Sequence, residues 1–417
     1  MEKKKQIDCF LPYSTTAMMQ SLAAQLYESG VVKNIYTLAA DVLPAEALPQ
    51  YPHQLQTGGL LSLATMRLIA TTATADYALL YLKQGPVTLG YHALERMLQV
   101  AEETGAAMVY ADHYSVEAGK TMKHPVTAYQ LGSIRDDFDF GSVVLLKTEY
   151  LKEYATREVE KDYQFAGWYD LRLFLSRKGE LFHLNEYLYT EEEDDLRASG
   201  EKQFDYVNPR NREVQIEMEQ AATAYLSAIN ALVDTTLYAQ PDFSGEAFLV
   251  EASVVIPVFN REKTVRDAIV SALSQKTDFP FNVIVVDNHS TDGTTEILSS
   301  LAADERLVHL IPTRTDLGIG GCWNYAINDA HCGRFAVQLD SDDLYSSENT
   351  LQTIVNAFHE QKAAMIVGSY RMCDFDLNTL PPGLISHNEW TEDNGCNNAL
   401  RINGLGAPRA FFTPLVR

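Results

Sequence analysis

Apolar runs and amphipathic segments alternate along the second half of the chain. The runs ASVVIPV (252–258), NVIVVD (282–287) and FAVQL (335–339) are typical of buried strands, and TVRDAIVSALSQ (264–275) has the spacing of a helix with one apolar face. Such strands, separated by helices of ~10–15 residues, indicate βαβ units with a mainly parallel sheet that is covered on both faces. The sequence therefore predicts an α/β fold.

The first half carries a fainter copy of the same pattern. IDCFLPY (7–13) resembles ASVVIPV, and each of KNIYTLAA (33–40), DYALLYLKQGP (76–86) and FGSVVLLKTEYL (140–151) resembles a segment roughly 250 residues further on. The offset grows by a few residues per segment, as insertions in loops would cause. We therefore expect two modules of the same topology in tandem.

Polar connections separate the two modules. YTEEEDDLRASGEKQFDYVNPRN (189–211) is rich in charge, and YAQPDFSGEA (238–247) contains the proline and glycine of a boundary. A helical pattern lies between these two stretches. We predict a first module over 1–195, a helical linker over 196–247 and a second module over 248–417.

Charge and cysteine content restrict the partners and the compartment. The formal net charge of −23 disfavours nucleic acid and anionic membrane as general partners. The five scattered cysteines form no CxxC pair, which favours reduced thiols in a cytoplasm-like compartment. No apolar run approaches the ~20 residues of a transmembrane segment, and we identify no secretory signal. We expect a protein of the cytoplasm, or one bound peripherally at the inner face of the membrane.

Three acids in four positions follow the strand FAVQL, namely Asp340, Asp342 and Asp343. In open α/β sheets, ligands bind beyond the carboxyl ends of the strands. An acid-x-acid pair at this place suits Mn²⁺ or Mg²⁺, which takes one or two carboxylates and leaves its other positions to water and phosphate oxygens. A solvated turn that caps the next helix is the alternative, but Ser346 and Ser347 already offer that cap. We predict a metal site at Asp340 and Asp342.

Two further polar clusters follow strands of the same predicted sheet. PVFNRE (257–262) ends the first strand, and DNHSTDGT (287–294) ends the second. Helix capping explains part of the second cluster; as a site, the cluster would present Asp287 to a nucleobase N–H. DLGIGG (316–321) lacks the third glycine of a dinucleotide-binding fingerprint, so we expect close packing at a helix start there.

Taken together, VVIPVFNREKTVRDAIVSALSQ, VIVVDNHSTDGT and FAVQLDSDDL resemble glycosyltransferase family 2, which has the Rossmann-like GT-A fold. The resemblance covers about 250–417. It implies transfer of a sugar, with inversion, from a nucleotide-sugar donor such as a UDP-sugar to a glycan or lipid-linked acceptor. Mn²⁺ or Mg²⁺ would be the cofactor, and synthesis of a bacterial surface polysaccharide would be the setting.

The resemblance also implies roles for the matching residues. Asp287 would hold the base, and Asp340 would contact the ribose or the sugar and share the metal with Asp342, with Ser341 between them in the substrate site. The residues that would border the nucleoside are Pro257, Val258, Phe259, Asn260 and Glu262.

Two departures from the family pattern concern catalysis. Cys322-Trp323-Asn324 stands where the family often has Ala-Arg-Asn, so a contact from that arginine is in doubt. An inverting displacement also needs a base to deprotonate the acceptor, and in the family this acid lies well downstream of the DxD motif. Its neighbourhood in the first module corresponds to 165–179, and the repeat offset places the partner beyond Arg417. We expect a C-terminally truncated second module. Either the chain is a fragment of a longer protein, which we favour, or this module is incomplete and inactive.

The first module lacks the acids of the site. Leu82-Lys83-Gln84 corresponds to the DxD positions, Ala39 to Asp287, and Gly167 and Trp168 to the family's base. Lys83 could replace a cation in a metal-free site, but we expect a degenerate GT-A-like module that packs, positions the acceptor or recruits partners.

Two other functions compete with the transferase. The missing acids of the first half and the missing base of the second favour a non-catalytic nucleotide-sugar-binding or scaffold protein. A sugar nucleotidyltransferase shares the parallel sheet, but its glycine-rich phosphate loop is absent from PVFNRE.

Overall fold

The computed structural model describes residues 5–43, 53–117, 119–159, 161–192, 211–388, 390–391, 393, 395–402, 406 and 408–417. The chain divides into two compact units. Unit 1 comprises Met1–Leu232 and Glu389–Ile402, and unit 2 comprises Val233–Asn388 and Asn403–Arg417. Each unit is described by itself.

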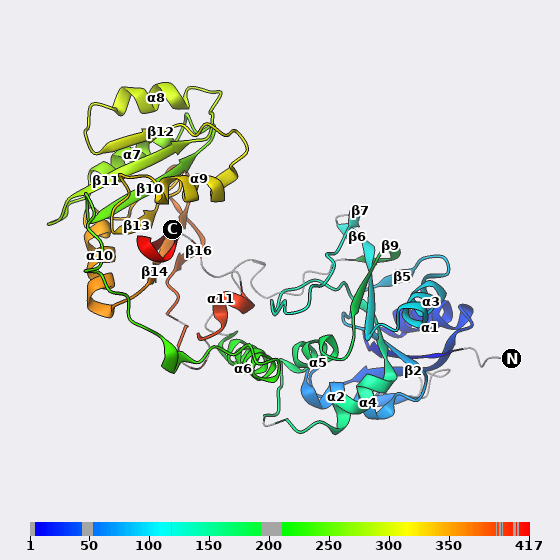
Figure 1. Ribbon diagram of the computed structural model, residues 1–417. Coiled ribbons are helices and arrows are strands. Elements are labelled where there is room, and N and C mark those ends of the chain that lie inside the picture. Colours follow the sequence, from blue (N-terminus) through cyan, green and yellow to red (C-terminus); the bar gives the residue numbers. More distant parts are fainter. Residues whose placement is uncertain are drawn as a thin grey trace. The chain divides into compact units, whose positions relative to one another are not determined.

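Unit 1 is built on one mixed sheet (Figure 1). In order across the sheet, its strands are β3 (Gln54–Gln56), β2 (Val32–Ala39), β1 (Ile7–Pro12), β4 (Tyr77–Tyr81), β8 (Val143–Lys147), β6 (Met108–Glu117), β9 (Leu181–Glu192) and β5 (Val87–Leu89), and β7 (Lys120–His124) pairs with β6. The strands from β3 to β4 run parallel, and β8 is antiparallel to both of its neighbours.

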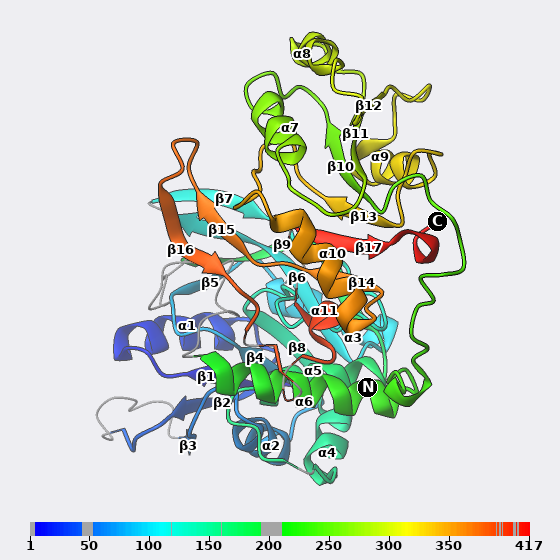
Figure 2. The same ribbon diagram turned by 90° about the vertical axis from the view of Figure 1, so that its left-hand side faces the viewer.

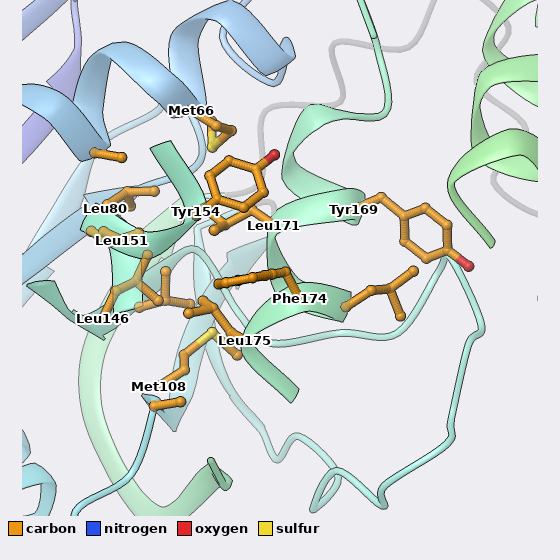
Figure 3. Close-up of a cluster of buried hydrophobic side chains, with 14 of the residues drawn as sticks. Met66, Leu80, Met108, Leu146, Leu151, Tyr154, Tyr169, Leu171, Phe174 and Leu175 are labelled. Atoms are coloured by element: carbon orange, nitrogen blue, oxygen red, sulfur yellow. The ribbon is translucent and has the colours of Figure 1, made fainter. Parts of the chain in front are cut away.

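Helices cover both faces of this sheet. The helices of unit 1 are α1 (Thr16–Glu28), α2 (Leu63–Thr72), α3 (Ala93–Thr104), α4 (Thr148–Thr156), α5 (Gly167–Ser176), α6 (Arg212–Ala228) and α11 (Asn398–Arg401). Apolar residues of α1 and α3 pack on one face, and those of α2, α4, α5 and α6 pack on the other. Figure 3 shows Met66, Leu80, Leu146 and Phe174 within the second cluster. Each such side chain contributes roughly 1.5–3 kcal/mol by leaving water.

The predicted linker contains a helix that packs in the core of unit 1. Ala221, Ala222, Tyr225 and Leu226 of α6 are buried in the cluster around α2, α4 and α5. Their spacing of three to four residues explains why this segment forms a helix with one buried face. The module boundaries at 195 and 247 stay a prediction, but α6 itself belongs to unit 1.

A short segment from late in the sequence completes unit 1. Arg401 of α11 is fully buried, and it forms ion pairs with Asp136 and with Glu219, whose Oε2 lies 3.6 Å from its Nε. Asn397 donates its backbone N–H to Glu219 Oε1 at 2.8 Å. A buried arginine is tolerated because carboxylates surround it.

Unit 2 is built on a second, smaller sheet. In order, its strands are β12 (Leu307–Leu310), β11 (Phe281–Asp287), β10 (Ala252–Val258), β13 (Phe335–Gln338), β17 (Arg409–Phe412) and β14 (Met365–Val367), and β15 (Tyr370–Cys373) and β16 (Thr379–Ile385) form a separate hairpin. The helices are α7 (Val265–Leu273), α8 (Thr294–Leu301), α9 (Gly318–Ile327) and α10 (Thr350–Gln361), with short 3₁₀ helices at Thr235–Leu237 and Thr413–Leu415.

Helices also cover both faces of the unit 2 sheet. Apolar residues of α7, α8 and α10 pack on one face, and Cys322, Ala326 and Ile327 of α9 pack on the other. Figure 2 shows α7 and α9 on opposite sides of β10 and β11. The continuous apolar run of β10 is explained by this arrangement, because successive side chains point to opposite faces that are both buried.

The two sheets share one topology. The order β12-β11-β10-β13-β17-β14 repeats the order β3-β2-β1-β4-β8-β6, and corresponding neighbours have the same parallel or antiparallel direction. The four segment matches found in the sequence correspond to β1 and β10, β2 and β11, β4 and β13, and β8 and β17. The mixed α/β fold with two Rossmann-like, mainly parallel sheets is confirmed.

Candidate functional site

Two loops beyond the carboxyl ends of β10 and β11 are joined by hydrogen bonds. Asn260 has a left-handed backbone with φ of 55°, and its Oδ1 accepts a hydrogen bond from the Thr291 backbone N–H at 2.7 Å. Its own N–H donates to Ser290 Oγ at 3.0 Å. Glu262 Oε2 accepts from the Gly293 backbone N–H at 3.1 Å. These side chains hold the two loops as one rim, which explains why polar residues gather at both strand ends.

Asp287 is buried at the centre of this rim. Its Oδ1 accepts from the Ser290 backbone N–H at 2.9 Å, and its Oδ2 accepts from Thr295 Oγ1 at 2.6 Å. Burial opposes ionisation of this carboxyl group, but the hydrogen bonds from Thr295 and Ser290 outweigh burial and lower its pKa. Both oxygens therefore have partners that shape the turn, and the contact with a nucleobase stays a prediction.

A pocket of about 580 Å³ opens between this rim and the acids after β13. Its volume lies in the range of ~300–1,000 Å³ that is usual for small-molecule sites. The lining residues are Asn260, Arg261, Glu262, Lys263, Thr264, Asp292, Asp342 and Phe375. The pocket thus brings together three of the predicted site residues, Asn260, Glu262 and Asp342.

The other predicted residues lie around the pocket and do not line it. Val258 and Ser341 are buried, Pro257 is half-buried, and Phe259 is exposed. Asp340 lies at the end of β13. Their roles toward a substrate stay predictions.

Sequence reasoning missed five of the lining residues. Arg261, Lys263, Thr264 and Asp292 adjoin the predicted motifs, so their place in the loops was the available signal. Phe375 lies in the turn between β15 and β16 and is 86% exposed. No motif marks it, because only the folded hairpin brings this turn to the pocket.

The three acids after β13 have different neighbours. Asp340 Oδ1 accepts from Gln338 Nε2 at 2.8 Å, and Asp342 Oδ2 lies 3.6 Å from Arg261 Nε at a half-exposed position. Although Asp343 is exposed, partial loss of hydration and the charges of Asp340 and Asp342 raise its pKa to about 6. The protein therefore leaves part of the repulsion among these carboxylates without compensation.

The donor set at this strand end suits a hard divalent cation. The described residues include no group of three or more histidine, cysteine or acid side chains that could hold a metal by themselves. Mg²⁺ and Mn²⁺ need no such group, because they use one or two carboxylates together with substrate phosphates. Asp340 and Asp342, beside a pocket of nucleotide size, fit this pattern.

The same place in unit 1 contains an internal ion pair. Lys83 Nζ pairs with Glu191 Oε1, His113 Nε2 lies 3.2 Å from the same oxygen, and Ser142 Oγ donates to Glu191 Oε2. Burial works against ionisation of Glu191, but the hydrogen bonds from His113, Lys83 and Ser142 prevail and lower its pKa to about 2. Lys83 thus has its counter-charge within the chain.

Gly167 of unit 1 has no room for a side chain. A Cβ atom at this position would come within 2.2 Å of the backbone of Ser62 and Leu63, where α2 begins. Close packing of α5 against this helix start therefore excludes an acid at Gly167, one of the two positions predicted to correspond to the family's base.

Within the described residues, we find no helix with the length and apolar character needed to cross a membrane.

Residues 253–412 match the family model described as Glycosyl transferase family 2. An uncharacterized glycosyltransferase of Haemophilus influenzae is 29% identical over 128 residues, which cover 31% of this chain and 50% of that protein. The putative teichuronic acid biosynthesis glycosyltransferase TuaG of Bacillus subtilis is 26% identical over 148 residues, covering 36% of this chain and 58% of that protein.

Among solved structures, the crystal structure of S. aureus TarS 1-349 in complex with UDP-GlcNAc has a TM-score of 0.31 and 24% identity, and the match covers 40% of this chain and 46% of that chain. The chain spans about half the length of the first curated relatives that it matches. On the family match, the chain carries a glycosyltransferase family 2 domain over residues 253–412.

Proposed function

We propose that unit 2 binds a nucleotide-sugar, with a UDP-sugar as the expected donor, and takes part in inverting, metal-assisted glycosyl transfer during synthesis of a bacterial surface polysaccharide. The observation that carries the proposal is the pocket of about 580 Å³ within the matched domain, where Arg261, Glu262 and Asp342 meet at the strand ends. The names of relatives support the setting: they include TuaG and the O-antigen chain rhamnosyltransferase WbaN of Salmonella anatum.

The charges in the pocket suit a nucleoside diphosphate. The net charge of −23 repels an anionic ligand unless local cations oppose it. Arg261 and Lys263 supply positive charge in the pocket lining. Asp340 and Asp342 would hold Mn²⁺ or Mg²⁺, and the bound ion neutralises negative charge that develops on a diphosphate leaving group.

The rim orients the rest of the donor in this proposal. Asn260 and Glu262 are fixed by hydrogen bonds to the neighbouring loop, so they present a preorganised surface to the nucleoside. Phe375 offers an exposed ring at the same pocket for the sugar or the acceptor. Transfer also requires a base for the acceptor hydroxyl, and we assign no residue to that role.

Thermal unfolding with UDP and Mn²⁺ tests the proposal. We expect the midpoint to rise by several degrees at ligand concentrations of ~100 Kd, because binding to the folded state alone adds about 2.7 kcal/mol. Asp342→Ala should abolish the rise, whereas Asp267→Ala, at an exposed acid on α7 outside the pocket lining, should retain it. No rise with UDP, GDP or another nucleoside diphosphate would refute the proposal.

A nucleotide-sugar-binding scaffold is the second candidate, favoured by the internally paired Lys83 and Glu191 of unit 1. Binding without release of nucleotide from any nucleotide-sugar, in the full-length protein with acceptor, would favour the scaffold over the transferase.

A further inference from the structure

Two polar side chains lie beneath the acids of unit 2, on neighbouring strands. The register that sets Val337 opposite Ala410 places Gln338 of β13 opposite Arg409 of β17. Arg409 Nε donates to Gln338 Oε1 at 2.8 Å, and Gln338 Nε2 donates to Asp340 Oδ1 at 2.8 Å. Gln338 is only 3% exposed. The three residues thus form a continuous chain of hydrogen bonds that ends on a predicted metal ligand.

The chemistry of the side chains fixes which atom donates and which accepts in each of these hydrogen bonds. A guanidinium group only donates, so the amide oxygen of Gln338 must face Arg409. The amide nitrogen then faces Asp340 and donates to its Oδ1. The positive charge of Arg409 polarises the amide and strengthens its N–H as a donor. One oxygen of Asp340 is thereby held in place.

Unit 1 shows that the fold does not need this polar pair. At the same place in its sheet, Leu80 of β4 lies opposite Val144 of β8, and both are buried. An apolar pair therefore fits between these strands. Burial of an amide is unfavourable unless it is hydrogen-bonded, so the buried Gln338, which bonds to the half-buried Arg409 and to Asp340, points to the acids beyond the strand.

We propose that Gln338 and Arg409 are positioning residues that orient Asp340 for the divalent cation of the donor site. The inference rests on the proposed function of unit 2. Partners behind a metal ligand fix its orientation, and their loss typically reduces metal affinity 10–100-fold. Within the described part of the chain, Asp342 has an ion pair with the half-exposed Arg261, at 3.6 Å, and no side-chain hydrogen bond of this kind.

The test replaces the pair by its counterpart from unit 1. In Gln338→Leu with Arg409→Val, calorimetric titration of Mn²⁺ in the presence of UDP should give an apparent Kd about tenfold or more above that of the wild type. UDP binding without metal and the midpoint of metal-free thermal unfolding should change little. A purely structural role would instead alter these two controls.

A second double variant keeps the test decisive. If the first variant does not fold, Gln338→Met with Arg409→Met takes its place, because it retains long side chains. It should show the same loss of Mn²⁺ affinity. Unchanged Mn²⁺ affinity in either folded variant would overturn the inference and leave the proposed function standing. Absence of Mn²⁺-dependent UDP binding in the wild type would overturn the proposed function, and the inference with it.

Discussion

The two units balance charge at the same strand end in opposite ways. In unit 1, Glu191 is buried against Lys83, His113 and Ser142, and its pKa falls to about 2. In unit 2, Asp343 stands beside two other carboxylates, and its pKa rises to about 6. One sheet topology therefore supports both a buried carboxylate that is paired with a lysine and a cluster of acids whose negative charge is only partly compensated. The first arrangement is balanced within the chain, whereas a bound cation would stabilise the second.

The neighbouring side chains follow the same division. Unit 1 packs Leu80 against Val144 below its strand ends, and unit 2 buries Gln338 against Arg409. The absence of the acids from unit 1 thus goes together with an apolar pair below them, at the positions that hold Gln338 and Arg409 in unit 2. If unit 1 differed from unit 2 only in the acids after the strand, a polar pair would be expected between β4 and β8 as well.

The largest effect is expected from Glu191→Gln in unit 1. Because the folded-state pKa of Glu191 lies below the ordinary value of 4.5, its ionised form stabilises the fold above that pH, and the benefit is lost as the pH falls toward 2. We expect the variant to be less stable by about 3 kcal/mol at neutral pH. Urea unfolding from pH 7 to pH 3 should show this difference shrink with acid.

Glu192→Ala is the matched control, because Glu192 is the exposed neighbour of Glu191 on β9. Its effect should stay within about 0.5 kcal/mol. An equal loss of stability in both variants, or a loss of stability in Glu191→Gln that is independent of pH, would contradict the claim that ionised Glu191 stabilises unit 1.

A smaller effect of opposite sign is expected from Asp343→Asn in unit 2. The raised folded-state pKa means that ionised Asp343 destabilises the metal-free fold above pH 6, and that this penalty disappears as the pH falls below the unfolded value of 3.8. Solvent screening at this exposed position limits the gain to about 1 kcal/mol or less. Metal-free unfolding at pH 8 and pH 4 measures it.

Asp267→Asn, at an exposed acid on α7, is the matched control, and its effect on stability should stay within about 0.5 kcal/mol. A destabilised Asp343→Asn variant at pH 8 would mean that the carboxylates are already compensated by the protein.

The strands of both units were accessible to sequence reasoning because their pattern is strong. β10 and β11 are continuous apolar runs, and β1 repeats the pattern with the same proline at its end. The acids at Asp340 and Asp342 were accessible for the same reason, since they directly follow such a strand. Local sequence is sufficient to place residues that directly follow a regular element; their role toward a metal stays a prediction.

Features that depend on contacts between distant segments were not predictable. Phe375 reaches the pocket only through the β15–β16 hairpin, and Arg401 is buried against Asp136, far earlier in the chain. The pairing of Gln338 with Arg409 likewise follows from the placement of β17 beside β13, and no sequence pattern links these two residues. In each case the partner is set by the tertiary fold.

The central claim is that unit 2 alone retains a ligand site, and the number of UDP molecules bound per chain tests it most directly. Calorimetric titration of UDP in the presence of Mn²⁺ should give one site per chain for the wild type and for Glu191→Gln, and none for Asp342→Ala. Two sites per chain, or full binding by Asp342→Ala, would contradict the account.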